Sequence, residues 1–168
     1  SKVYDVAINT PITFAANLST KLKNEVFLKR EDMQPIFSFK IRGAYNKISN
    51  LSVQQKKRGV LTASAGNHAQ GVANACKKLN IPCLIVMPLT TPEIKVKSVK
   101  RFGAKVLLYG DNYDQASKKA IQMAKEQKLE FIEAFDDPLT IAGQGTVGKE
   151  ILDEDNLLDV IFVPVGGG

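Results

Sequence analysis

From Gly59 onward, short apolar segments alternate with longer segments whose apolar residues recur at helical spacing. The segment 83–87 is apolar throughout, which is typical of a strand with both faces covered. Strands that alternate with helices form parallel sheets with right-handed connections. The sequence therefore predicts an α/β fold around a parallel sheet. The expected strands are 60–63, 83–87, 106–109, 131–132 and 160–163, and the expected helices are 69–79, 92–102, 113–127 and part of 141–152.

The first 55 residues follow a less regular pattern. Residues 10–12 are expected to be extended, because the residue before a proline avoids the helical region. Residues 17–23 are compatible with a short turn, and residues 26–29 are expected to form a strand. Apolar residues recur at helical spacing over 39–48, which predicts a helix with Lys40 at or near its N-terminus.

Composition and cysteine usage indicate a globular protein from a reducing compartment. Hydrophobic residues make up 44% of the chain and charged residues 24%, which is ordinary for a soluble domain. No apolar run approaches the ~20 residues of a membrane span, and the N-terminus lacks the apolar core of a secretory signal. The cysteines Cys76 and Cys83 do not indicate a disulfide framework. We therefore expect a cytoplasmic protein with no membrane partner.

The net charge of +6 and the pI of about 9.3 raise the question of a nucleic-acid partner. The basic residues are spread along the chain, and most recur at helical spacing opposite apolar residues, which is typical of solvated helix faces. Tryptophan is absent, and aromatic and basic residues are not interleaved as in surfaces that stack bases. We expect no nucleic-acid partner.

Lys40 is the first candidate for catalysis. It lies between Phe39 and Ile41, after a turn marked by Gln34-Pro35. Apolar surroundings disfavour the ammonium form of a lysine and lower its pKa, and the neutral amine can form a Schiff base. The alternative is a surface lysine at the start of a helix, with its stem along the fold. The octapeptide 38–45 alone leaves both interpretations open.

A loop of small and polar residues follows the strand expected at 60–63. Residues 62–71 read Thr-Ala-Ser-Ala-Gly-Asn-His-Ala-Gln-Gly and lead into a helix. Ligands of open α/β sheets bind at the carboxyl ends of the strands, and the N–H groups of a helix N-terminus bind anions such as carboxylates. Ser64 and Asn67 add side-chain hydrogen bonds, although either could be an ordinary helix cap. His68, the one histidine, has no carboxylate placed in the sequence to pair with it.

Three glycines, 166–168, follow the strand expected at 160–163. Their N–H groups would suit a phosphate, and a flexible tail is the alternative. A strand that runs into glycines at the last residue also indicates a chain cut within a motif, so we expect a longer protein.

Several short motifs occur in series: Lys-Arg-Glu-Asp at 29–32, Ser-Phe-Lys-Ile-Arg-Gly-Ala at 38–44, Ser-Ala-Gly-Asn-His-Ala-Gln-Gly at 64–71, Ala-Gly-Gln-Gly-Thr at 142–146 and Gly-Gly-Gly at 166–168. In this order and spacing the chain resembles the threonine dehydratase (threonine deaminase) family. That family belongs to the fold-type-II, tryptophan-synthase-β-like pyridoxal phosphate enzymes. Residues 29–35 are more similar to the biosynthetic form of the family than to the catabolic form.

The resemblance implies pyridoxal 5′-phosphate as cofactor and a role for each matched residue. Lys40 would bind the cofactor through a Schiff base and act as general base. Phe39 would pack beside the pyridine ring of the cofactor. Asn67 would bond the phenolic oxygen of the cofactor. The substrate carboxylate would be bound by Ser64, Ala65, Gly66, Asn67 and His68, and the phosphate by a loop that begins with Gly166, Gly167 and Gly168. No metal is expected.

The resemblance also implies the reaction, the first step of isoleucine biosynthesis: L-threonine, and L-serine less well, would lose water and ammonia, with 2-oxobutanoate as the product from L-threonine. A homo-oligomer, a tetramer in the family, and isoleucine as effector are further implications. The chain would comprise an N-terminal segment of the large domain at 1–55, a small α/β domain at 56–155, and a return strand with the start of the phosphate loop at 156–168. Such a partial chain is expected to be inactive alone.

Two other interpretations stay open. Serine racemase and serine dehydratase have the same fold type, but the racemase pattern carries a serine where this chain has Ala65, and alanine cannot transfer a proton. The second interpretation is a folded, non-catalytic fragment of the enzyme that cannot hold the cofactor.

Overall fold

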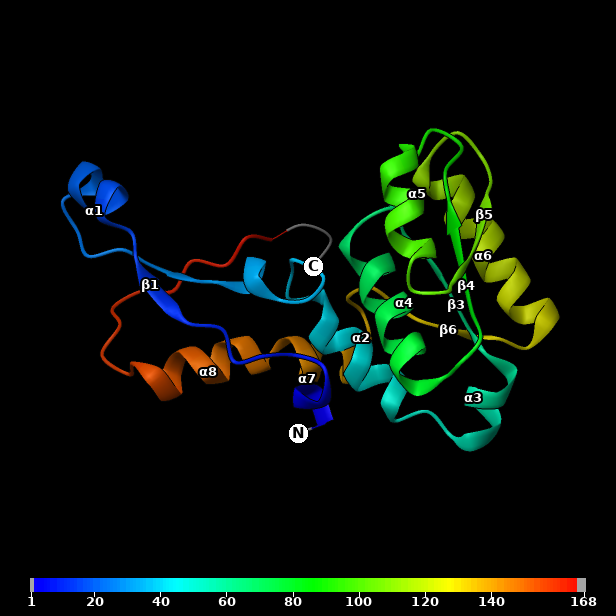
Figure 1. Cartoon of the computed structure of the whole chain (residues 1–168), viewed down its shortest axis with the longest axis horizontal. Helices are drawn as coiled ribbons and strands as arrows, with labels where there is room; N and C mark the ends of the chain where they lie inside the picture. Colours follow the sequence, from blue (N-terminus) through cyan, green and yellow to red (C-terminus); the bar gives the residue numbers. More distant parts are fainter. Residues whose placement is uncertain (1, 166–168) are drawn as a thin grey trace.

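A four-stranded parallel sheet forms the centre of the larger body in Figure 1. The computed structural model describes residues 2–165, so the expected phosphate residues Gly166, Gly167 and Gly168 lie outside the described residues. The strand order is β5-β4-β3-β6, and every pairing is parallel. The strands are β3 (Val60–Ala63), β4 (Cys83–Met87), β5 (Lys105–Leu108) and β6 (Glu130–Phe131).

Helices cover both faces of this sheet, as the crossover connections of a parallel sheet require. The helices are α2 (Lys40–Ser49), α3 (Val53–Arg58), α4 (Asn67–Leu79), α5 (Glu93–Lys100) and α6 (Tyr113–Gln127). Successive side chains of β4 point to opposite faces: Ile85 and Met87 pack against α4 and α5, whereas Val86 packs against α6. The mixed α/β, parallel-sheet fold is therefore confirmed.

A smaller body is built from both ends of the chain (Figure 1). Strands β1 (Ile12–Phe14) and β2 (Phe27–Lys29) pair antiparallel, and α1 (Ala16–Leu22) lies in the connection between them. The 3₁₀ turns η1 (Lys2–Asp5) and η2 (Glu31–Met33) flank this hairpin. Helices α7 (Pro138–Gln144) and α8 (Thr146–Glu154) return beside β1 and α2.

The contact between α2 and α7 depends on two glycines. A Cβ atom on Gly143 would lie 2.6 Å from the Cα of Gly43 and 2.7 Å from the carbonyl oxygen of Arg42. Real Cβ atoms do not approach backbone so closely, so any side chain here would push the helices apart. The Ala-Gly-Gln-Gly-Thr motif at 142–146 thus serves helix packing.

Most expected elements are present, with small shifts at their ends. The strands at 60–63 and 83–87 and the helix at 113–127 have the expected bounds, whereas the helix expected at 69–79 begins at Asn67 and the turn expected at 17–23 is the helix α1. The prediction of a strand at 160–163 is wrong, because these residues are 42–90% exposed and lie in no strand. Within residues 2–165, no strand lies beside them to accept their backbone hydrogen bonds.

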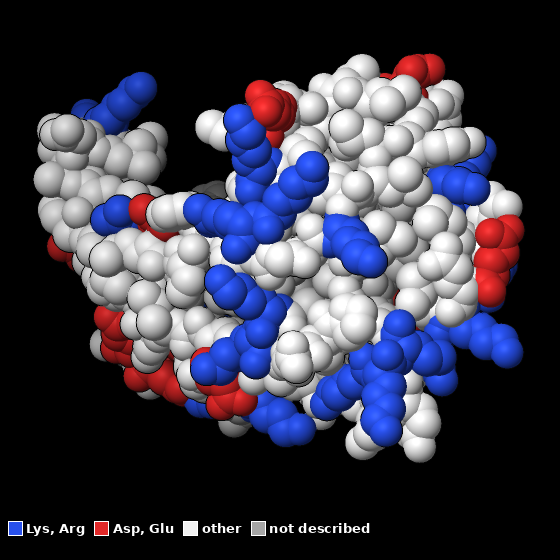
Figure 2. Space-filling view, turned by 45° about the vertical axis from the view of Figure 1, so that its right-hand side comes forward, with Lys and Arg blue, Asp and Glu red and all other residues white. Residues whose placement is uncertain are grey.

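No helix within residues 2–165 is long and apolar enough to cross a membrane. On the face shown in Figure 2, lysine and arginine side chains lie in separate groups divided by uncharged surface.

Candidate active site

The candidate site lies where the carboxyl ends of β3 and β6 meet the N-termini of α2 and α4. Residues 64–66 follow β3, residues 132–134 follow β6, and Lys40 is the first residue of α2. A Cβ atom on Gly71, in the second turn of α4, would lie 2.9 Å from the carbonyl oxygen of Lys40. The glycine therefore lets α4 lie against the first turn of α2, which brings the two predicted motifs together.

The side chain of Lys40 is half-buried and fixed by one hydrogen bond. Its Nζ atom donates to the carbonyl oxygen of Ala134 at 3.0 Å and lies 5.3 Å from the centroid of the Phe39 ring. Burial lowers the pKa of Lys40, because an ammonium group loses hydration next to apolar surface. The position favours the reactive-amine interpretation of Lys40 over that of a surface lysine.

The loop from Ser64 to Asn67 presents backbone rather than side chains. The hydroxyl of Ser64 accepts the N–H groups of Gly66 at 3.2 Å and Ala69 at 3.3 Å, so it is used in forming the turn. A Cβ atom on Gly66 would meet nothing within 4 Å. Asn67 is exposed at the first position of α4, and no acceptor among the described residues pairs with the N–H groups of Asn67 and His68. Two unpaired N–H groups at a helix N-terminus can bind an anion.

His68 lies beneath this loop, with 4% of its surface exposed. Its Nε2 atom is 3.1 Å from the carbonyl oxygen of Ile132, so Nε2 carries the proton and donates. Burial and the nearby charge of Lys40 lower the pKa of His68 to about 4. The ring is therefore neutral at neutral pH. The backbone N–H of His68 is therefore the group that could make the predicted substrate contact, because the ring is enclosed.

Thr62, Ile132 and Ala134 support the site and were not singled out from the sequence. The hydroxyl of Thr62 donates to the carbonyl oxygen of Ile132 at 2.8 Å, beside the bond from His68. These bonds fix the loop after β6, whose Ala134 carbonyl in turn holds Lys40. A polar residue at the end of a buried strand, such as Thr62, is the local signal that could have indicated this arrangement.

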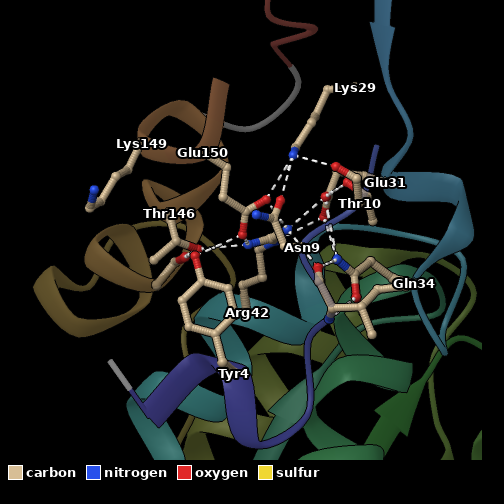
Figure 3. A network of polar contacts seen from close by, with 12 residues as sticks. Tyr4, Asn9, Thr10, Lys29, Glu31, Gln34, Arg42, Thr146, Lys149 and Glu150 are labelled. Atoms are coloured by element: carbon tan, nitrogen blue, oxygen red, sulfur yellow. Dashed lines mark hydrogen bonds and ion pairs between the residues drawn. The ribbon is translucent and has the colours of Figure 1, made fainter. Parts of the chain in front are cut away.

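A buried ionic network fixes the helix that carries Lys40 (Figure 3). The guanidinium of Arg42 is fully buried and donates to Glu31 at 2.7 and 2.8 Å and to Glu150 at 2.5 and 2.9 Å. Lys29 and Tyr4 also donate to Glu150, at 2.9 and 2.8 Å. Although burial acts to raise it, hydrogen bonds from Arg42, Lys29 and Tyr4 hold the pKa of Glu150 below its ordinary value.

These features fit a cofactor that binds covalently to a lysine amine. The amine of Lys40 is partly desolvated, and two buried atoms near it, Ser38 Oγ and His68 Nδ1, have no hydrogen-bond partner among the described residues. Ser38 thus offers a polar atom that the described chain leaves unused, whereas Nδ1 of His68 belongs to the enclosed ring. The predicted phosphate residues, 166–168, lie outside the described residues.

Comparison with known proteins relates the whole chain to one family. The family model described as "Pyridoxal-phosphate dependent enzyme" matches residues 3–168. The biosynthetic L-threonine dehydratase of Pasteurella multocida (strain Pm70) is 56% identical over 168 residues, which are 100% of this chain and 33% of that protein. The chloroplastic biosynthetic threonine dehydratase of Arabidopsis thaliana is 54% identical over 169 residues, which cover 100% of this chain and 28% of that protein.

Solved structures also match this chain over nearly its full length. The processed form of threonine deaminase isoform 2 from Solanum lycopersicum superposes with a TM-score of 0.97 and 50% identity, over 100% of this chain and 46% of that one. Maize serine racemase superposes with a TM-score of 0.94 and 34% identity, over 99% of this chain and 51% of that one. The chain spans about a third of the length of the curated relatives it matches.

Proposed function

Because the chain belongs to the pyridoxal-phosphate dependent enzyme family, we propose that it is the lysine-bearing part of an L-threonine dehydratase. The whole enzyme would convert L-threonine to 2-oxobutanoate and ammonia, the first step of isoleucine biosynthesis. Identity of 54–56% to biosynthetic threonine dehydratases over the full chain supports this substrate. The observation that carries the proposal is the half-buried amine of Lys40 at the carboxyl ends of β3 and β6.

Lys40 would hold the cofactor and later move the substrate proton. When bound, pyridoxal phosphate supplies an electron sink for charge that develops at the substrate α-carbon. A general base must be unprotonated at the working pH, and burial favours the neutral amine of Lys40. The carbonyl oxygen of Ala134 can hold this amine in place during the transfer.

The loop after β3 would orient the substrate. The N–H groups of Asn67 and His68, for which no described residue is an acceptor, support binding of the substrate carboxylate there, and the open space at Gly66 lets a ligand approach the backbone. A fixed carboxylate determines which bond of the α-carbon faces Lys40. Phe39 and the Asn67 amide would position the cofactor ring, and 166–168 its phosphate.

A serine racemase is the second candidate, supported by the similarity to maize serine racemase. Racemisation requires a second group that returns a proton to the opposite side of the α-carbon. Residue 65 is alanine, which carries no transferable proton. This residue favours elimination over racemisation.

Replacement of Lys40 tests the proposal in the full-length protein. Lys40→Ala is expected to lower 2-oxobutanoate release from L-threonine at least about a hundredfold, because the general base is lost. Borohydride reduction followed by peptide mass spectrometry should attach the cofactor to the Lys40 peptide in the unmutated protein and to no peptide in the variant. Lys57→Ala, at an exposed position of α3, is the control. Equal trapping at another lysine in Lys40→Ala would refute the assignment.

Four finer properties stay proposals. We propose a homo-tetramer that responds to isoleucine, as in the family that the chain resembles; sedimentation with and without isoleucine tests both. We also propose a cytoplasmic location, although relatives include proteins described as chloroplastic and mitochondrial. The absence of a nucleic-acid partner remains a prediction.

A further inference from the structure

The two cysteines of the chain meet at the far end of α4 from the candidate active site. Cys76 lies in the last turn of α4, and Cys83 is the first residue of β4. The neighbouring thiol of Cys83, together with burial, raises the pKa of the Cys76 thiol. Cys76 packs in the core beside Ile81, and Cys83 lies against the same cluster. Both cysteines also line the same hollow, so the two thiols are neighbours, as an intramolecular disulfide requires.

A hollow of about 210 Å³ opens over the pair. Its lining includes both cysteines together with Lys77, Asn80 and Phe102. Cys76 is only 2% exposed, whereas Cys83 is half-buried. Of the two cysteines, Cys83 is therefore the more accessible to a small reagent in the hollow.

The rim of the hollow is positively charged. The Nζ atom of Lys77 lies 5.9 Å from the centroid of the Phe102 ring, and the guanidinium carbon of Arg101 lies 4.8 Å from it. Both cations are therefore held at the ring that lines the hollow. Nearby cations attract anionic reagents.

We propose that Cys76 and Cys83 form a dithiol site that small anionic disulfides, of the class of glutathione disulfide, oxidise to an intramolecular disulfide. In the first step the Cys83 thiolate attacks one sulfur of the reagent, a mixed disulfide forms, and one thiolate leaves. In the second step Cys76 loses its proton to solvent and attacks the Cys83 sulfur, and the second thiolate leaves. Two protein thiols are oxidised and one reagent disulfide is reduced to two thiols.

The link would join the end of α4 to the start of β4. The backbone already turns tightly there, since the N–H of Ile81 donates to the carbonyl oxygen of Cys76 at 2.9 Å. Asn67 lies about 14 Å away along the axis of α4, so the modification site is separate from the proposed active site. The inference does not depend on the proposed reaction.

Peptide mass spectrometry of the full-length protein after incubation with glutathione disulfide tests the proposal. The peptide that carries both cysteines is expected to lose two hydrogen atoms and to carry no glutathione. Cys76→Ala should accumulate the mixed disulfide on Cys83, and Cys83→Ser should leave Cys76 unmodified. An unreacted pair in the unmutated protein, or glutathione retained on Cys83 with Cys76 still reduced, would overturn the proposal. Both results come from the unmutated protein, so they do not depend on the folding of a variant.

The charge of the rim is tested by a matched pair of variants. Lys77→Gln should slow the reaction with glutathione disulfide severalfold and leave the reaction with the neutral hydroxyethyl disulfide unchanged. Lys78→Gln removes the next charge along the helix, which does not line the hollow, and should behave like the unmutated protein. Equal slowing by both variants, or none by Lys77→Gln, would show that the rim does not select anionic disulfides.

Discussion

Lys40 and His68 are two ionisable residues of the candidate site whose neutral forms are favoured by burial. Burial lowers the pKa of each, and the positive charge of Lys40 contributes to the shift at His68. The carbonyl oxygen of Ala134 accepts a hydrogen bond from Lys40, and that of Ile132 accepts one from His68. The site therefore places an amine with a lowered pKa beside a neutral imidazole, which agrees with a lysine that forms a covalent bond and moves a proton.

Stability should depend on pH through His68. The pKa of His68 is about 4 in the folded protein against 6.5 for the free side chain, so the unfolded chain binds its proton first. The contribution of His68 is complete above pH 6.5 and falls as the pH drops towards 4, by about 3 kcal/mol in total. His68→Gln removes this titration. Urea unfolding should therefore show a stability difference between protein and variant that changes from pH 7 to pH 5, and a constant difference would contradict the pKa shift.

Reaction choice should depend on Ala65. The methyl group of Ala65 packs against the cluster around Ala69 and Ile85, so a hydroxyl there also costs some stability. Ala65→Ser in the full-length enzyme is expected to raise the share of D-serine formed from L-serine, because the hydroxyl can supply a proton. A chiral assay of the serine left after partial turnover measures this share, with the exposed Ala142→Ser as control. Substantial D-serine from the unmutated enzyme would favour the racemase.

Helix α2 contacts elements from both the N-terminal and the C-terminal parts of the described chain, namely η1, α7 and α8. It packs on α4 through Gly71, on α7 through Gly43 and Gly143, and on α8 through Arg42. The position of Lys40 at its first turn therefore depends on three separate contacts.

The glycine contact predicts opposite effects of two similar substitutions. Gly143→Ala places a methyl group within 2.7 Å of the backbone of α2 and should destabilise the protein by about 1–3 kcal/mol through overpacking. Gly148→Ala, in α8, meets nothing within 4 Å and should stabilise it by about 0.5–1 kcal/mol, because alanine is the better helix former. Thermal unfolding of both variants measures the difference. A stability loss shared by both variants would contradict the close approach.

The buried network predicts a large cost for one lost charge. Glu150→Gln leaves the buried Arg42 and Lys29 with one carboxylate fewer, and breaking a buried pair costs about 3–5 kcal/mol. Asp153→Asn breaks the exposed pair with Lys149, for which about 0.5 kcal/mol is expected. Chemical denaturation compares the two variants. Similar losses would mean that the network is not held in place by its charges.

In the whole molecule, the N-terminal segment and the last helices form one unit beside the sheet (Figure 1). The division into 1–55, 56–155 and 156–168 remains a prediction. The contacts of Arg42 with Thr146 and Glu150, and of Asn46 with Leu139, place α7 and α8 with the N-terminal elements. We therefore propose that the small domain ends before Pro138.

The sequence by itself determined the elements whose signal is local. A stretch of a few residues is enough to recognise an apolar strand covered on both faces or the polar loop after β3. The same holds for the alanines at helical spacing in 113–127. The tertiary structure alone decided what joins distant residues. The bond from Lys40 to Ala134 spans 94 residues and that from Arg42 to Glu150 spans 108, and no local period encodes such a pairing. The error at 160–163 has the same cause, because an apolar run becomes a strand only where another strand accepts its hydrogen bonds.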